Sequence, residues 1–161
     1  MIPVILGMND PSGTAVLSSA VPGSAGSRLL ALAILGGLTA RQYEEGFERR
    51  NLLDTKRWSS GRARASAERM VASLEGREVV VLGREVWRAF SPRSVGYFTW
   101  VHHHGATWHL IPHPSGRNLA YNNPDIRRRA ADVLRRVHDY HHRSPVRAMP
   151  SAGAGNLVSS R

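Results

Sequence analysis

A histidine between two prolines is the feature of this sequence that most strongly suggests chemistry. His113 follows an apolar, strand-like segment, residues 107–111, and lies between Pro112 and Pro114. An imidazole can donate a hydrogen bond or move a proton near neutral pH, and the prolines restrict the backbone around it. We therefore expect His113 to act from a fixed position beyond the end of a strand.

A second chemical cluster follows the first apolar segment. Residues 3–8 have the composition of a buried parallel strand and lead into Asn9, Asp10 and Pro11. An amide or a carboxylate can orient water, and a carboxylate is the better general base. Ligands of parallel sheets bind beyond the carboxyl ends of the strands. The sequence therefore predicts that Asn9 or Asp10 meets His113 in one cleft.

The elements that would position these residues alternate between strand and helix, which predicts an α/β domain with a largely parallel sheet. Thr39 and Gln42 have capping-box spacing and mark the start of one helix. The expected strands are residues 3–8, 51–54, 78–82, 97–102 and 107–111, and the main expected helices are residues 28–38, 40–49, 64–74 and 124–140. Residues 1–142 would form the domain, and residues 143–161, which lack periodicity, would form a flexible tail.

The composition favours a nucleic-acid partner. The 161 residues carry a formal charge of +10, with 21 arginines and a single lysine. A basic surface favours polyanions because each neutralised phosphate releases counterions. No apolar run is long enough to cross a bilayer, and the start of the chain does not resemble a signal peptide. We therefore expect a cytoplasmic, nucleoid-associated monomer that binds DNA and no membrane.

Metal and redox chemistry receive little support from the sequence. The absence of cysteine excludes disulfides, thiolate metal sites and cysteine-ligated iron–sulfur clusters. The run His102, His103 and His104, together with His109, suggests zinc. However, successive residues of a strand point to opposite faces, so the three adjacent rings cannot converge. We expect no metal and no cofactor.

Four segments, taken in order, resemble the motifs of the uracil-DNA glycosylase superfamily. They are LGMNDPSG (6–13), FERRNLLD (47–54), VVVLGREVWRAF (79–90) and HLIPHPSGRN (109–118). The resemblance implies a three-layer α/β/α fold with a four-stranded, mainly parallel sheet. It also implies hydrolysis of a base–sugar bond in DNA. Because the chain is short and has no cysteine, it resembles a compact or phage-type branch of the family that has no iron–sulfur cluster.

The resemblance assigns catalytic roles to two segments. His113 would stabilise the base as it leaves with negative charge. The water-orienting residue is Asn9 when the motif is counted from Gly7, and Asp10 when it is counted back from Pro11, because this chain has one extra residue there. Both alternatives stay open at this point.

The resemblance also implies contacts with the base and with DNA. Gly7, Met8 and Pro11 would line the base site, and Phe47 would stack on a flipped base. Asn51 or Asp54 would contact the edge of the base. An acid there would repel O4 of uracil, so either the target is a modified pyrimidine or Asp54 faces away. The expected DNA contacts are Ser12, Gly13, Pro114, Ser115, Gly116, Arg117 and Asn118.

Two main hypotheses follow for the function. The first is a monofunctional DNA glycosylase acting on uracil or a modified pyrimidine; the only lysine, Lys56, lies outside the chemical motifs, which disfavours a Schiff-base lyase step. The second is a catalytically weak or inactive reader of modified bases on the same fold. A hydrolase of free nucleosides is a third option, although it would not need a basic surface.

Overall fold

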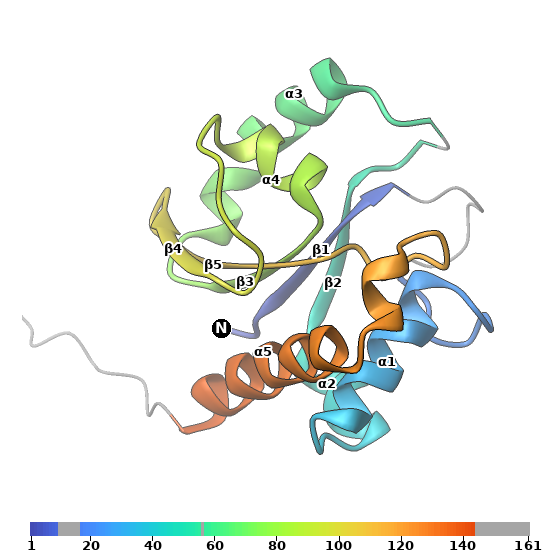
Figure 1. The fold of residues 1–161 in the computed structure, drawn as a ribbon. Helices are drawn as coiled ribbons and strands as arrows, with labels where there is room; N and C mark the ends of the chain where they lie inside the picture. Colours follow the sequence, from blue (N-terminus) through green and yellow to red (C-terminus); the bar gives the residue numbers. More distant parts are fainter. Residues whose placement is uncertain (10–16, 56, 144–161) are drawn as a thin grey trace, which may run out of the picture.

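A five-stranded sheet forms the centre of the protein (Figure 1). The structure is a computed structural model that describes residues 1–9, 17–55 and 57–143. The order across the sheet is β2 (Glu48–Leu53), β1 (Val4–Asn9), β3 (Glu78–Leu82), β5 (Ala106–Ile111) and β4 (Trp100–His103). The first four strands run parallel, and β4 pairs antiparallel with β5.

Helices cover both faces of this sheet (Figure 1). One layer contains α1 (Ala25–Leu35), α2 (Ala40–Gly46) and α5 (Pro124–Arg143). The other contains α3 (Ser60–Met70), the 3-10 helix η1 (Val71–Leu74) and α4 (Arg84–Phe90). A second 3-10 helix, η2 (Leu119–Asn122), precedes α5. The expected α/β fold, with a mostly parallel sheet between helices, is therefore present.

The sheet has five strands rather than the four that the family resemblance implies. The additional strand, β4, forms a hairpin with β5 through His104 and Gly105, whose φ angles are 47° and 70°. Two consecutive positive φ angles are typical of the type I′ turn, which matches the twist of antiparallel strands. A two-residue turn of this kind allows the segment before β5 to fold back as an edge strand.

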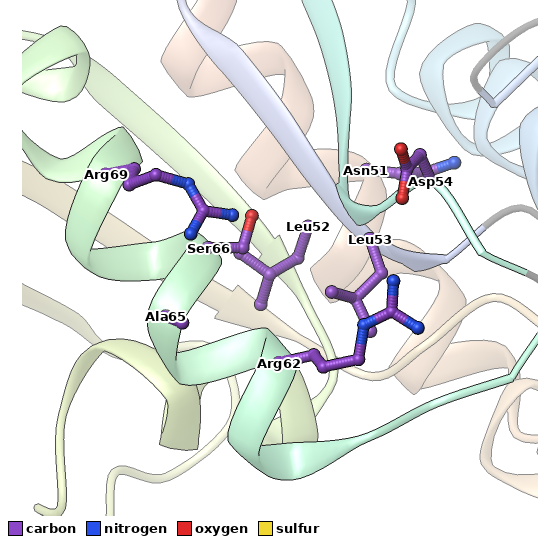
Figure 2. A pocket seen from close by; sticks show the side chains of 8 residues that line it. All are labelled: Asn51, Leu52, Leu53, Asp54, Arg62, Ala65, Ser66 and Arg69. Atoms are coloured by element: carbon purple, nitrogen blue, oxygen red, sulfur yellow. The ribbon is translucent and has the colours of Figure 1, made fainter.

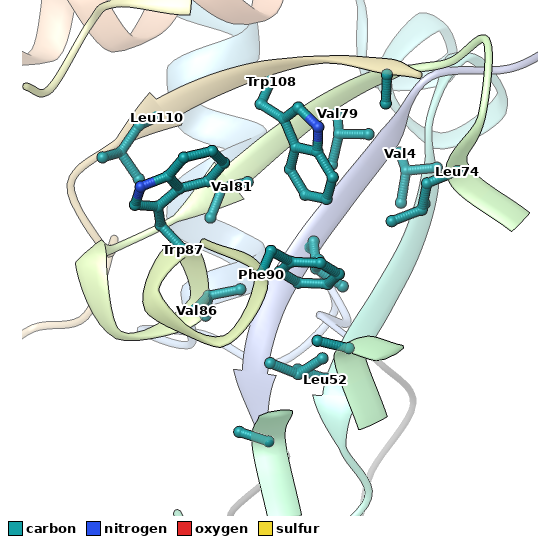
Figure 3. Packing of buried hydrophobic residues seen from close by; sticks show 14 of the residues in the cluster. Val4, Leu52, Leu74, Val79, Val81, Val86, Trp87, Phe90, Trp108 and Leu110 are labelled. Carbon is teal, nitrogen blue, oxygen red and sulfur yellow. The ribbon is translucent and has the colours of Figure 1, made fainter. Parts of the chain in front are cut away.

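The core is divided between the two faces of the sheet. In β3, Val79 and Val81 pack toward α3 and α4, whereas Val80 and Leu82 pack toward α1 and α5. On the α3–α4 face, Trp108 lies between two other aromatic rings, with centroids 5.7 Å from Trp87 and 4.7 Å from Phe90 (Figure 3). The continuous apolar sequence of β3 thus reflects burial on both sides, as expected for a central parallel strand.

Local sequence signals located some boundaries correctly and others only approximately. Thr39 and Gln42 form the predicted capping box at the start of α2. In contrast, α1 begins at Ala25 rather than near residue 28, because Ser24 accepts a hydrogen bond from the amide of Ser27 and caps the helix. None of the described helices is long and apolar enough to cross a membrane. The predicted tail lies outside the described residues from position 144 onward.

A charged cluster joins the strands at their amino ends. Arg77, only 8% exposed, donates hydrogen bonds to the carbonyl of Ile2 and to the carboxylate of Glu48, the latter at 2.5 Å. Glu48 also accepts from Arg50 at 2.5 Å. These contacts explain why β2 begins at Glu48, three residues before the expected start, despite its charged sequence. The hydrogen bond from Arg50, followed by that from Arg77, holds the pKa of Glu48 below its ordinary value.

We predict that Glu48→Gln lowers the free energy of unfolding by about 1–2 kcal/mol at pH 7, because Arg77 then keeps its buried charge with a weaker partner. Since the pKa of Glu48 is lowered by folding, its contribution is present above the ordinary glutamate pKa. It is lost as the pH falls through the lowered value. Urea denaturation at pH 7 and at acidic pH measures this difference. Glu68→Gln, an exposed change on α3, is the control, and equal losses in both variants would contradict the prediction.

Candidate functional site

The carboxyl ends of three parallel strands meet at one cavity of about 280 Å³. Met8 comes from β1, Gly83 directly follows β3, and His113 follows β5. The cavity is also lined by Arg84, Glu85, Arg88, Tyr97 and Asn118. Ligand cavities commonly begin near roughly 300 Å³, so a group the size of a single nucleobase suits this space. The fold therefore brings the end of the first strand close to the segment that carries His113, although the two are far apart in the sequence.

Gly83 allows the backbone of His113 to lie against the end of β3. Its φ of +91° lies in the region that favours glycine, and its amide donates to the carbonyl of Ile111 at 2.9 Å. A Cβ atom at position 83 would lie 3.2 Å from the Cβ of His113. Gly83 therefore helps to determine the position of the His113 side chain. It was not among the predicted site residues, although a glycine directly after a buried strand is the signal that identifies it.

Two side chains hold the backbone on either side of the imidazole. The hydroxyl of Tyr121 donates to the carbonyl of Pro112 at 2.6 Å, and the amide nitrogen of Asn118 donates to the carbonyl of His113 at 2.9 Å. The amide oxygen of Asn118 accepts from the backbone of Ala120 at 3.1 Å. Burial raises the pKa of Tyr121, which keeps its hydroxyl as a donor. Asn118, predicted to contact DNA, thus uses both ends of its amide to hold the loop.

The His113 ring is suited to donate a hydrogen bond in its neutral form. Burial lowers its pKa below the ordinary histidine value, so the ring is mainly neutral at pH 7. A neutral imidazole has one N–H donor and one acceptor nitrogen. Among the residues that the structure describes, none forms a hydrogen bond with this ring. The N–H group of the His113 ring thus has no hydrogen-bond acceptor among the described residues.

The end of β1 lies beside this cavity. Asn9 is the last residue of β1, directly follows the cavity-lining Met8, and pairs with Leu53 of β2. The side chain of Asn9 is outside the described part of the structure. The same holds for Asp10, Pro11, Ser12 and Gly13. The choice between Asn9 and Asp10 as the water-orienting residue therefore stays a prediction.

Gly7 and Asn51 face one another across the pairing of β1 with β2. They are register partners, and a Cβ at position 7 would lie only 2.6 Å from Oδ1 of Asn51. That oxygen is buried and has no hydrogen-bond partner within the described residues. A buried acceptor without a donor is uncommon and requires an explanation. Because Gly7 has no side chain, the amide of Asn51 can occupy the space beside it, near the carboxyl end of the sheet.

Asp54 lines a different cavity from His113. It is exposed after the end of β2 and belongs to a space of about 400 Å³ between β2 and α3 (Figure 2). Arg62, Ser66 and Arg69 of α3 line the same space. Figure 2 shows Asp54 on the opposite side of this space from the α3 side chains. Asn51 lines this same space, and the cavity that holds His113 includes neither Asn51 nor Asp54.

Phe47 lies in the core rather than at the site. It is 3% exposed and packs against Tyr43 and His138, with ring centroids 5.9 and 6.1 Å away. It precedes the first residue of β2 and is therefore at the amino end of the sheet, opposite the cavity. Phe47 has no exposed face for a flipped base. We assign it to the core, in place of the predicted stacking role.

The predicted DNA-contacting loop adjoins a second cavity of about 620 Å³. Arg117 and Gly116 are exposed, whereas Ser115 is half-buried and Pro114 is buried. The cavity is lined by Pro114, Gly116 and Asn118 from the loop and by Arg28, Arg127 and Arg128 from α1 and α5. Gly116 approaches Arg28 closely, since a Cβ there would lie 3.1 Å from its guanidinium. Three guanidinium groups thus gather beside the loop that carries His113.

Seven exposed arginines, which we call the edge arginines, lie near the carboxyl edge of the sheet: Arg28, Arg62, Arg64, Arg84, Arg117, Arg127 and Arg129. Apart from Arg117, each lies in the first two turns of a helix that follows a parallel strand. Helices of this kind begin at the carboxyl edge of the sheet. Within the described ranges, none of the seven forms an ion pair with a carboxylate. In contrast, Arg49, Arg50 and Arg77 near the amino edge are paired with Glu44 or Glu48.

The histidines of the β4–β5 hairpin contact different partners. His102 contacts the hydroxyl of Thr107 at 3.2 Å, and His103 contacts the carbonyl of Phe90 at 3.0 Å. His109 lies at 2.5 Å from the carboxylate of Glu78. In the part of the chain that the structure describes, no group of three or more histidine or carboxylate side chains is arranged to hold a metal ion.

No family model matches the chain, and no curated protein matches its sequence. The resemblance to uracil-DNA glycosylases therefore depends on the four sequence motifs.

We predict that the pKa of His113, measured by NMR titration of its ring resonances, lies below the ordinary value of about 6.5, because burial disfavours the charged ring. Between the lowered pKa and the ordinary value the unfolded chain binds more protons, so His113 makes the fold less stable as the pH falls through that window. The same titration in concentrated urea is the control and should restore the ordinary value. A folded-state pKa at or above the value in urea would contradict the prediction.

Proposed function

We propose that this protein is a monofunctional DNA glycosylase that hydrolyses the N-glycosidic bond of uracil, or of a modified pyrimidine, flipped out of DNA. The observation that carries the proposal is the convergence of the end of β1 with a neutral His113 at a nucleobase-sized cavity. The edge arginines, which lack acidic partners among the described residues, supply the electrostatic attraction for the phosphate backbone.

In the proposed reaction, the oxygen of a water molecule forms a bond to C1′ of the sugar as the bond from C1′ to N1 of the base breaks. The electron pair of the broken bond remains on the base, which leaves as an anion. His113 donates its N–H to the O2 carbonyl, where negative charge develops. Asn9 or Asp10 orients the water. The proton released by the water passes to Asp10, if that residue is the base, or to solvent, and the departed base is later protonated from solvent.

Asn51 is the preferred reader of the base edge in this proposal. The N3–H group of uracil is a donor, and the buried Oδ1 of Asn51 is an acceptor without a partner in the described structure. A buried polar group built to pair with a substrate strongly rejects an analogue that lacks the matching group. Asn51 shares the cavity between β2 and α3 with the exposed Asp54, but it also pairs with Gly7, the residue before the cavity-lining Met8. We therefore propose that Asn51 accepts from N3–H of the base, with Asp54 facing solvent.

Leu119 is suited to assist base flipping, although it was not among the predicted DNA contacts. It is 72% exposed and is the first residue of η2, two positions after Arg117. Proteins that unstack DNA frequently insert an apolar side chain between base steps. An exposed leucine within a loop rich in glycine and asparagine is the sequence signal for this role. We propose that Leu119 enters the stack while Arg117 holds phosphate.

We expect the purified protein to create alkali-labile sites in oligonucleotides that contain uracil or a modified pyrimidine. His113→Ala should lower single-turnover excision by about 10²-fold or more, because one donor to the developing anion is removed, and leave DNA affinity nearly unchanged. His102→Ala, which removes an exposed histidine outside the cavity, is the matched control. Comparing Asn9→Ala with Asp10→Ala identifies the residue that orients water. Tight binding with intact strands across the base panel would instead support the reader of modified bases.

We predict that Leu119→Ala lowers excision from double-stranded DNA by roughly tenfold, since flipping from a duplex costs a few kcal/mol of unstacking. Excision from single-stranded DNA should change little, because the target base there is already accessible. Ile34→Ala, which truncates another exposed apolar residue, on α1, serves as the control. Equal losses on both substrates would remove Leu119 from the flipping step.

A further inference from the structure

Arg84, one of the edge arginines, also lines the His113 cavity, and the reaction described above gives it no part in bond cleavage. It is the first residue of α4 and lines the same cavity as His113. Its guanidinium carbon lies 4.7 Å from the centroid of the Tyr97 ring, which also lines the cavity. A guanidinium stacked on an aromatic face is held in one plane, and its N–H groups remain free to donate at the edge.

The charges around this cavity leave Arg84 without an opposing acid. Arg88 is paired with Glu85 at 2.7 Å, so those two charges largely offset one another. His113 is mainly neutral because burial lowers its pKa. Within the described residues, Arg84 forms no ion pair with a carboxylate. The described residues that line the cavity therefore carry a net positive charge, and the cation beside Tyr97 is its source.

We propose that Arg84 is a further catalytic residue, which stabilises the negative charge on the departing base from the rim of the cavity shared with His113. The inference rests on the proposed glycosylase function. As the C1′–N1 bond breaks, the electron pair delocalises over N1 and the two carbonyl oxygens of the base. His113 donates one neutral hydrogen bond to this anion. Arg84 donates charge-assisted N–H bonds and transfers no proton, so it remains a guanidinium throughout.

The two donors have complementary physical roles. A charged donor forms a hydrogen bond roughly twice as strong as a neutral one, and its effect is larger where water is partly excluded. A guanidinium keeps its charge across the working pH range, whereas the imidazole of His113 is mainly neutral at pH 7 and keeps a single N–H. Arg84 thus supplies the positive charge that a neutral His113 lacks. Tyr97 is a positioning residue, because it acts by holding the guanidinium.

The test measures how the excision rate depends on the stability of the leaving anion. Fluorine at C5 stabilises the anion, so 5-fluorouracil is the better leaving group and needs less help from the protein. Arg84→Gln should lower single-turnover excision of uracil by about 10²-fold, and it should lower excision of 5-fluorouracil by a clearly smaller factor. Arg64→Gln, which removes an edge arginine outside the cavity, is the control for loss of DNA binding.

Variants of Tyr97 test whether the stack positions the guanidinium. Tyr97→Phe keeps the aromatic face and should retain excision, whereas Tyr97→Leu should reproduce the leaving-group dependence of Arg84→Gln. Equal losses on both bases in Arg84→Gln, accompanied by weaker DNA binding, would assign Arg84 to a phosphate and overturn the inference. If the unaltered protein excises neither base nor any modified pyrimidine, the proposed function itself fails.

Binding of the free base separates these two failures. The affinity for free 5-fluorouracil is measured on either side of the pKa of that base, with no bond to be cleaved. The unaltered protein should bind the anion more tightly than the neutral base, and Arg84→Gln should lose this preference. Lack of any preference for the anion in the unaltered protein would overturn the inference about Arg84, whatever the result of the excision assay.

Discussion

The parallel pairing of β1 with both of its neighbours is the constraint on which the site depends. β1 pairs in the same direction with β2 and β3, and β3 pairs in the same direction with β5. All four carboxyl ends must therefore lie along one edge of the sheet. Because parallel strands need crossover connections, the helices that follow them also begin at this edge. One pattern of backbone hydrogen bonds thus brings together Met8, His113 and the edge arginines.

The sequence predicted those parts of the fold that local patterns determine. The apolar run of β3 could only be a strand buried on both faces, and Thr39 with Gln42 marked the start of α2. The charged start of β2 was not recognised, because one of the two arginines that bind Glu48, Arg77, is distant in the chain. The fifth strand was expected over residues 97–102 but covers Trp100–His103, because its end depends on the positive φ angles of the hairpin turn.

The site was predictable to the extent that strand ends determine it. The rule that ligands bind beyond the carboxyl ends of parallel strands was sufficient to place His113 beside the end of β1. It could not distinguish residues that contact a ligand from residues that hold the loop, which is the role of the Asn118 amide. It also could not identify Arg84, because the importance of that residue comes from stacking on Tyr97, thirteen positions later in the sequence.

The burial of His113 and the position of Arg84 both depend on the turn at Gly83 that follows β3. Gly83 brings the end of β3 against His113, which shields the imidazole from water and keeps it neutral. The residue after Gly83 begins α4, so the same turn that buries the imidazole also places a guanidinium at the cavity. A protonated His113 would be the stronger donor, but it would carry the cost of a buried charge. In the proposed reaction, a permanent cation at the rim and a neutral donor inside avoid that cost, because Arg84 remains partly in water.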